Sequence, residues 1–140
     1  MNETASALSL DAQAPVIELV DAMPGLPAMA KCVLVQLDDT GALYRLQSVL
    51  DPDLRLLVAA SPVFFADYAP EIDEETASKI GLEDAADALV LLVVTVGGSA
   101  AESTANLLAP IVLNSRTRQA AQVLQASADL PLQAPLIPAA

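Results

Sequence analysis

The stretch Ser103-Thr-Ala-Asn106-Leu-Leu-Ala-Pro110-Ile-Val-Leu-Asn114 constrains the fold more than any other part of the chain. It is too long and too apolar for a loop, yet it contains an amide, and a buried amide without partners costs about 1–3 kcal/mol. Asn106 must therefore bond to specific groups of the chain or face something outside it. Pro110 has no N–H to give to a sheet, which restricts the stretch to an edge, a bulge or a break. Asn114-Ser115 predicts a turn.

Short apolar segments separated by turn signals predict a mainly β fold. We expect strands over residues 16–20, 32–37, 43–50, 54–60, 88–96, 105–113 and 119–124. Ser61-Pro62 is typical of a helix start with Ser61 as the cap, and a second short helix over 71–80 should end at Gly81. Together these features predict one small antiparallel β-barrel-like domain over residues 1–128, with one or two short helices inserted around residues 62–87. Residues 129–140 carry frequent prolines and should form an extended, mobile tail.

The charge balance limits the classes of partner. Eighteen acidic residues stand against six basic ones, which is the wrong sign for binding nucleic acid. The acidity either favours a basic protein partner or keeps an apolar chain soluble and monomeric, and composition alone favours solubility. The acids are concentrated between Asp67 and Asp87, where Lys79 is the only base. No segment reaches the roughly 18 apolar residues of a membrane helix and the first residues carry no base, so we expect a cytoplasmic protein.

The sequence does not support catalysis. It contains no histidine, and no glycine-rich loop leads into a lysine as phosphate binding would require. Cys32 is the only cysteine, lies in an apolar segment and should be inert, and a single cysteine agrees with a reducing compartment. Asp67 and Glu71 can be read as an acid–base pair or as ligands of a hard cation, but their spacing favours a solvated helix face. We predict that the protein is not an enzyme and holds no metal or cofactor.

Phe64, Phe65 and Tyr68 fall within five positions of a chain that has only four aromatic residues. They either pin the helical insertion to the barrel or partly face solvent and anchor a partner. The fourth, Tyr44, begins a strand that also carries polar residues.

Strand alternation puts Ser48 and Leu46 on one face of that strand and Gln47 on the other. Both faces therefore carry a polar group, which is unusual for a barrel strand. Either Gln47 or Ser48 lines a groove or bonds to Asn106, and the alternation does not choose between them.

The motifs occur in an order that resembles the flagellar assembly factor FliW family. They are Gly25-Leu-Pro27, Tyr44-Arg-Leu-Gln-Ser-Val49, Ser61-Pro62 with Phe65, Asp67-Tyr68, Thr104-Ala-Asn106 and Gln122-Val-Leu124. Each motif alone is weak, but their order and spacing over residues 24–125 are specific. The chain departs from the family pattern at Met23, Met29 and Ala30, where phenylalanines are usual, at Ser61, where Asp is common, and at Ala120, where Gly is common.

The resemblance implies a small cytoplasmic protein, monomeric when free, that binds flagellin and the translational regulator CsrA. Such a protein stops CsrA from repressing the flagellin message, and flagellin competes with CsrA for it. It implies no direct contact with nucleic acid or membrane. The alternatives are a chaperone for flagellin only and a β-barrel domain that binds a small apolar ligand. The candidate partner-binding residues are Tyr44, Gln47, Ser48, Phe65, Tyr68, Thr104, Asn106, Pro110 and Asn114.

Overall fold

A computed structural model of the chain describes residues 16–20, 27–66, 68–99, 102–125, 130–131 and 133–135, with the backbone alone described at 27 and 28. Among the positions singled out above, Met23, Gly25, Leu26 and Asp67 lie outside these residues.

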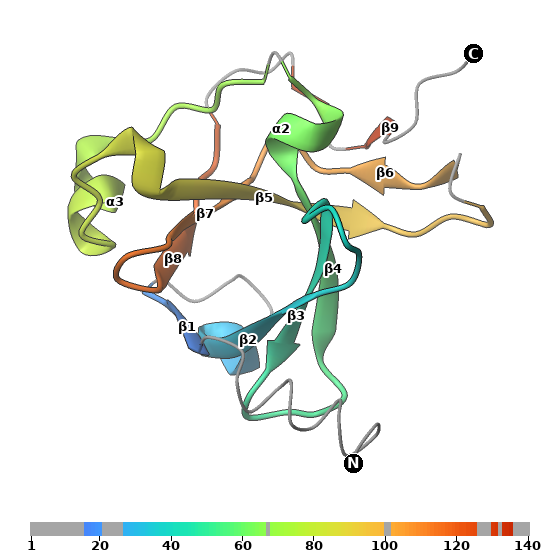
Figure 1. Ribbon diagram of the computed structural model, residues 1–140, viewed down its shortest axis with the longest axis horizontal. Coiled ribbons are helices and arrows are strands. Elements are labelled where there is room, and N and C mark those ends of the chain that lie inside the picture. The colour runs from blue at the N-terminus through green and yellow to red at the C-terminus, as the bar shows by residue number, and fades with distance from the viewer. Residues whose placement is uncertain are drawn as a thin grey trace.

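Seven strands close into a barrel (Figure 1). They are β1 (Val16–Leu19), β2 (Lys31–Gln36), β3 (Leu43–Ser48), β4 (Arg55–Ala60), β5 (Ala88–Thr95), β7 (Ile111–Asn114) and β8 (Gln119–Gln122). Their order is β4-β3-β2-β1-β8-β7-β5, and pairing of β4 with β5 closes the ring. Closure pairs strands that would otherwise be open edges. The predicted fold class is confirmed, but β1 and β8 run parallel, which the sequence did not indicate.

The remaining strands extend the sheet beyond the ring. β6 (Thr104–Ala105) pairs with the far end of β5, and β9 (Ala134–Pro135) pairs with β6. Two short α-helices, α2 (Ser61–Phe64) and α3 (Glu74–Lys79), and the 3-10 turns η1 (Pro27–Ala30) and η2 (Ala85–Asp87) complete the described elements. The described part of the tail contacts the domain, because Leu107 N–H donates to the carbonyl of Pro131 at 3.1 Å.

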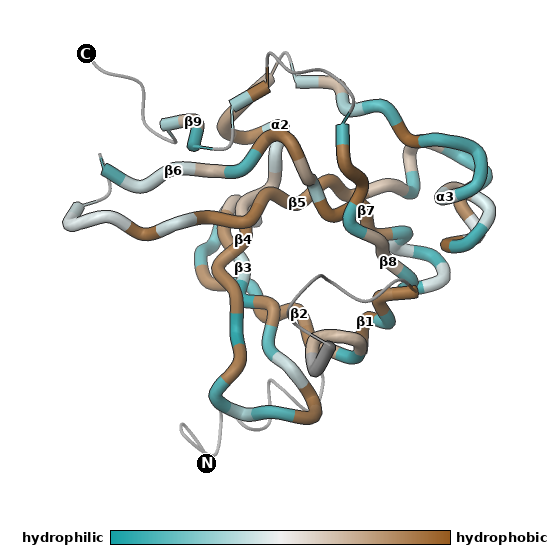
Figure 2. Tube along the Cα trace, turned by 180° about the vertical axis from the view of Figure 1, so that it is seen from behind, coloured by the Kyte–Doolittle hydropathy of each residue, from teal (hydrophilic) through white to brown (hydrophobic). Residues whose placement is uncertain are grey.

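The inward-facing side chains of the strands fill the barrel. Buried members of this core include Ile17, Leu46, Val58 and Leu91, with Met29 packed among them. The apolar residues follow the strands around the ring, whereas α3 is largely hydrophilic (Figure 2).

Cys32 lies in this core and is fully buried. Its thiol donates to the carbonyl of Met29 at 2.8 Å, and burial raises the pKa of Cys32 to about 11. The thiol therefore stays protonated at neutral pH, in agreement with the predicted inert role.

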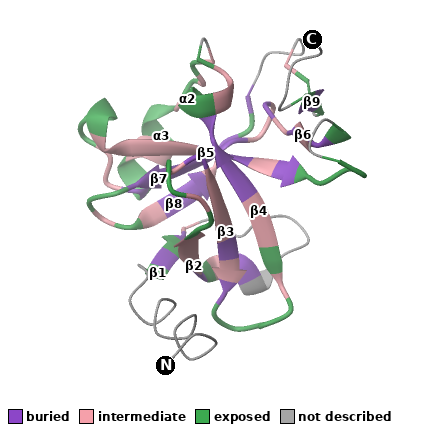
Figure 3. Cartoon of the chain, turned by 45° about the vertical axis from the view of Figure 1, so that its right-hand side comes forward, coloured by how far each residue is buried: buried purple, intermediate pink, exposed green. Residues whose placement is uncertain are grey.

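Two smaller clusters lie on the outer surface of the barrel. In one cluster, the aromatic side chains of α2 and of the residues that follow it pack on Ala59 and Leu92; these aromatic residues are Phe64, Phe65 and Tyr68. The other places Ile80, at the end of α3, on Val112 and Ala121. In Figure 3 most of α3 is exposed, whereas β3 and β4 are buried or half-buried along most of their length. The aromatic residues thus pin the helical insertion to the barrel, which was one of the two readings of their sequence.

Two details of the predicted elements are wrong. Residues 105–113 do not form one strand, because the chain turns at Asn106 between β6 and β7. Ser61 is not a helix cap: Ala60 holds that position without a side-chain bond, and Ser61 is buried inside α2. The predicted turn at Asn114-Ser115 is present: Asn114 ends β7, residues 115–118 form the turn, and Arg118 N–H donates to Asn114 O at 2.7 Å.

The second helix is shorter than predicted. It begins at Glu74 because Asp73 is its cap, accepting a hydrogen bond from Thr76 N–H at 3.2 Å. It ends where predicted, since Gly81 takes a φ of +67°, a conformation that favours glycine.

Candidate partner-binding surfaces

The predicted partner-binding residues do not form one site. The structure divides them among the α2–β6 region, strand β3 and the ends of β7. The first group is Phe65, Tyr68, Thr104 and Asn106, the second is Tyr44, Gln47 and Ser48, and the third is Pro110 and Asn114.

In the α2–β6 region all four side chains are half-buried. The hydroxyl of Tyr68 donates to the carbonyl of Leu107, and burial raises the pKa of the Tyr68 phenol. Phe65 and Tyr68 both pack on the apolar cluster that contains Ala59, Leu92 and Leu107. The half-exposed residues of this region therefore offer both apolar and polar atoms to solvent. Their contacts with the barrel hold Phe65 and Tyr68 in place.

Asn106 is bonded to its neighbouring backbone, which is one of the two possibilities that the sequence left open. Its Oδ1 accepts from Leu108 N–H at 2.9 Å and from Ala109 N–H at 3.2 Å, and its own N–H donates to Val93 at 3.0 Å. This arrangement is an Asx turn, and it explains how an amide fits between apolar residues. It also explains why the predicted long strand breaks here.

Gln47 and Ser48 are bonded to the β3–β4 turn rather than to Asn106. Gln47 Nε2 donates to the carbonyls of Pro52 and Leu54 at 3.0 and 3.2 Å. Ser48 is buried, and its Oγ accepts from Leu50 and Asp51 N–H at 3.1 and 2.9 Å. Both residues therefore shape this turn.

Asn114 is completely buried and joins the β7–β8 turn to the end of α3. Its Nδ2 donates to Ile80 O at 2.9 Å, and its Oδ1 accepts from Arg116 N–H at 2.9 Å. Thr117 Oγ1 donates to the same Ile80 carbonyl at 2.8 Å, and Arg116 Nη2 donates to Gly81 O at 2.7 Å.

Burial gives Ser48, Pro110 and Asn114 no side-chain surface to offer a partner in this conformation. Their hydrogen bonds and packing instead hold the turns on which more exposed residues stand.

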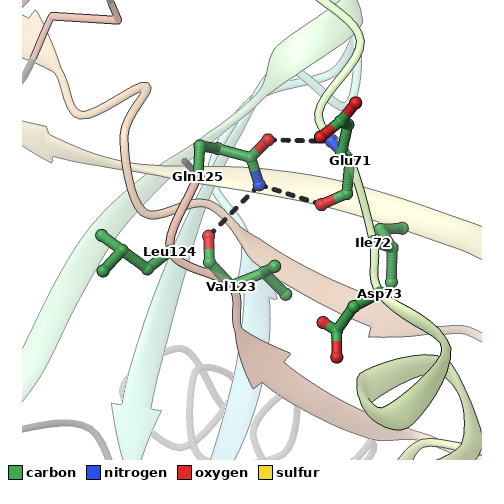
Figure 4. Close-up of a pocket in the computed structure, with 6 residues that line it drawn as sticks. All are labelled: Glu71, Ile72, Asp73, Val123, Leu124 and Gln125. Carbon is green, nitrogen blue, oxygen red and sulfur yellow. Dashed lines mark hydrogen bonds between the residues drawn. The ribbon is translucent and has the colours of Figure 1, made fainter. Parts of the chain in front are cut away.

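The sequence did not indicate a hollow of about 590 Å³ that lies between residues 71–73 and 123–125 (Figure 4). Gln125 crosses it: its Oε1 accepts from Glu71 N–H at 2.8 Å, and its Nε2 donates to the carbonyl of Glu71 at 3.0 Å. Ile72 and Val123 belong to the apolar cluster under α3. The hollow thus has apolar lining, and one buried glutamine ties its two sides together.

Leu124 lines the hollow and is 74% exposed. The backbone fixes this exposure: Val123 N–H donates to Pro110 O at 2.8 Å and Gln125 N–H donates to Leu108 O at 2.7 Å. These bonds continue the strand-like pairing beyond β8, so buried Val123 and Gln125 alternate with an outward Leu124. Sequence reasoning missed the site, although the apolar pair Val123-Leu124 at the end of a predicted strand breaks the alternation and was the available signal.

The hollow is acidic on the side of α3. Glu71 and Asp73 line it, and Glu74 and Glu75 form the first turn of the helix. A hydrogen bond from the Thr76 hydroxyl lowers the pKa of Asp73, with its backbone bonds acting in the same direction, so this carboxylate is charged at neutral pH. Lys79 is the one base of α3, and its Nζ atom lies 3.6 Å from a carboxylate oxygen of Glu75.

Within the described residues, no helix is long and apolar enough to cross a membrane, and no group of three or more candidate side chains is placed to hold a metal ion.

The fold and these surfaces define a small β-barrel protein with two helical segments packed on its outside. The profile of the FliW protein family matches residues 2–136, and the chain belongs to this family. It is 38% identical over 102 residues to the flagellar assembly factor FliW of Bacillus licheniformis, an overlap that covers 73% of this chain and 71% of that protein. Its identity to the flagellar assembly factor FliW of Bacillus subtilis is 31% over 109 residues, covering 78% and 76%.

A solved structure agrees with this assignment. The crystal structure of a flagellar assembly factor FliW superimposes with a TM-score of 0.82 at 27% sequence identity, covering 89% of this chain and 86% of that one. The resemblance drawn from the ordered motifs is confirmed.

Proposed function

We propose that this protein is a flagellar assembly factor that acts by binding two proteins, the translational regulator CsrA and flagellin. Membership of the FliW family, with relatives named as flagellar assembly factors on both sequence and structure, is the observation that carries the proposal. When the protein holds CsrA, the flagellin message is translated. When flagellin accumulates it takes the protein, CsrA is released, and synthesis stops until flagellin is exported.

The charge distribution supports a basic partner such as an RNA-binding regulator. The chain carries a formal net charge of −12, and carboxylates gather around α3 and the hollow. Such a field accelerates the encounter with a positively charged protein and opposes direct binding of nucleic acid. It also favours a monomer in the absence of partners, because copies of this chain repel one another.

The partly exposed predicted residues are our proposed contact residues. Phe65 and Tyr68 are half-exposed aromatic residues packed with Ala105 and Leu107, and the neighbouring polar residues Thr104 and Asn106 are also half-exposed, a combination common at binding surfaces. Gln47 and Tyr44 lie on β3, apart from this group. Ser48, Pro110 and Asn114 support the neighbouring turns from inside.

Calorimetric titration tests the proposal. Each partner is titrated into the protein alone and into the protein saturated with the other partner. We expect binding of both, and a loss of CsrA affinity in the presence of flagellin equal to the loss of flagellin affinity in the presence of CsrA. Stable ternary complexes with unchanged affinities would contradict the switch. Binding of flagellin without CsrA would favour the flagellin-only chaperone instead, and binding of neither would refute the proposed function.

A further inference from the structure

We propose that the hollow between residues 71–73 and 123–125 is a docking site for an extended segment of a partner protein, one that carries basic side chains beside an apolar one. Leu124 is the apolar contact and the carboxylates of Glu71 and Asp73 are the polar ones. The inference deepens the proposed function by naming a surface for a basic partner, and it rests on that function only for the partner's identity.

The apolar part of the site is presented rigidly. Leu124 is 74% exposed, and its two neighbours are fixed by backbone bonds to Pro110 and Leu108. Because these backbone bonds already hold Leu124 outward, its backbone loses little conformational freedom when a partner covers the side chain. An isolated exposed leucine is ordinary, but this one stands at the rim of a hollow large enough for several side chains, with its side chain directed away from residues 71–73, so an occupant in contact with both sides must cross the backbone of residues 123–125 (Figure 4).

Gln125 gives the site a defined shape. Only 8% of this residue is exposed, and its amide bonds to both backbone groups of Glu71, which holds residues 71–73 against the end of β8 (Figure 4). The carboxylate side and the leucine side of the hollow are therefore fixed relative to each other before any partner arrives.

The negative charge around the hollow favours a basic segment over an acidic one. Glu71, Asp73, Glu74 and Glu75 are all exposed on one side of it. Two bases close to α3 are paired with acids, Lys79 with Glu75 and Arg116 with Asp87. A lysine or arginine entering the hollow is attracted, and an acidic segment is repelled. A second copy of this chain, with its net charge of −12, is disfavoured for the same reason.

Two short synthetic peptides provide the probe. One holds a single leucine between two lysines, and the other has glutamates in place of the lysines. Each is titrated into the isotope-labelled protein while backbone amide shifts are followed. We expect the lysine peptide to shift the amides of residues 71–75 and 123–125, to bind more weakly as salt rises, and to bind more tightly than the glutamate peptide.

Two variants locate the leucine contact. Leu124→Ser should weaken the affinity for the lysine peptide by about tenfold. Val96→Ser is the control: Val96 follows β5 and is 65% exposed, and its substitution should leave this affinity unchanged. Folding of both variants is checked from their amide spectra. Failure of the lysine peptide to bind, shifts centred elsewhere, equal binding of both peptides, or equal binding by the Leu124→Ser variant would each overturn the inference.

Two further measurements separate this inference from the proposed function and from self-association. Titration of the unmodified protein with CsrA tests the proposed function. Binding of the lysine peptide tests the docking site, and its result does not depend on whether CsrA binds. Sedimentation equilibrium decides the occupant: a monomer at all concentrations agrees with the inference. A dimer that Leu124→Ser abolishes would assign the hollow to a second copy and overturn it.

Discussion

The side-chain amide of Gln125 bonds to both backbone groups of Glu71, a residue 54 positions earlier in the chain. The glutamine thus pairs with Glu71 as a neighbouring strand would, although residues 71–73 belong to no sheet. Through this pair the segment that leads into α3 is joined to the chain that leaves β8.

We predict that Gln125→Leu destabilises the protein by about 1–2 kcal/mol, because the N–H and carbonyl of Glu71 lose their partners while the side-chain volume is kept. Urea denaturation should show a lower midpoint with an unchanged slope. Leu124→Ser is the matched control, since its exposed side chain should leave the midpoint unchanged within about 0.5 kcal/mol. A wild-type midpoint for Gln125→Leu would mean that water replaces the amide at no cost.

Asn106→Leu should cost about 1–3 kcal/mol, because the N–H groups of Leu108 and Ala109 lose the Oδ1 atom that they share. Asn106→Asp keeps an acceptor at this position and is the control, with a smaller loss expected. Thermal and urea unfolding of both variants measure the difference. Equal stability of the leucine variant and the natural protein would show that the turn does not need this side chain.

The stability of the protein should fall as the pH is lowered towards 3. Hydrogen bonds from the Thr40 hydroxyl and from Leu43 N–H lower the pKa of Asp38, and the Thr76 hydroxyl does the same for Asp73. A carboxyl whose pKa is lower in the folded state stabilises that state above its unfolded pKa, and this contribution is lost as the pH falls through the folded pKa. Asp38→Asn should therefore reduce stability at pH 7 and make it depend less on pH.

Urea midpoints between pH 7 and pH 3 provide the measurement for Asp38→Asn. Asp39→Asn, at the exposed neighbouring position, serves as the control. An identical pH dependence in the natural protein and in Asp38→Asn would contradict the assigned role of this carboxylate.

The strands were predictable from sequence because apolar segments and turn residues alternate along the chain, and the predicted strands at 16–20, 54–60 and 88–96 nearly match β1, β4 and β5. The break at Asn106 was missed because its side chain competes with the sheet for backbone N–H groups. The parallel contact of β1 with β8 and the bond of Asn114 to Ile80 join distant segments, and periodicity carries no information about such pairs.

The candidate site was predictable only in part. The motifs identified residues that matter for the shape of the protein, but a motif does not separate a contact residue from one that holds a turn, as Ser48 and Asn114 show. The hollow at Leu124 was missed because its two sides meet only in the folded chain.

The last prediction concerns the acidic segment around α3 and the rate at which a basic partner is met. Neutralising four of its exposed carboxylates should slow association with CsrA several-fold at low salt and change dissociation less, because exposed charges steer an encounter more than they hold a complex. The variant carries Glu74→Gln, Glu75→Gln, Glu83→Gln and Asp84→Asn. Stopped-flow association at low and high ionic strength measures the effect, and the difference from the natural protein should shrink as salt screens the charges.

A second variant separates the position of the charge from its total amount. It neutralises four exposed carboxylates outside the segment, with the substitutions Glu18→Gln, Asp39→Asn, Asp53→Asn and Glu102→Gln. Both variants have the same net charge, so a smaller effect in the second assigns the steering to the α3 side of the molecule, where the hollow lies. Equal slowing in both variants would mean that the total charge alone governs the encounter. Association rates that do not change with salt would show that these carboxylates serve solubility only.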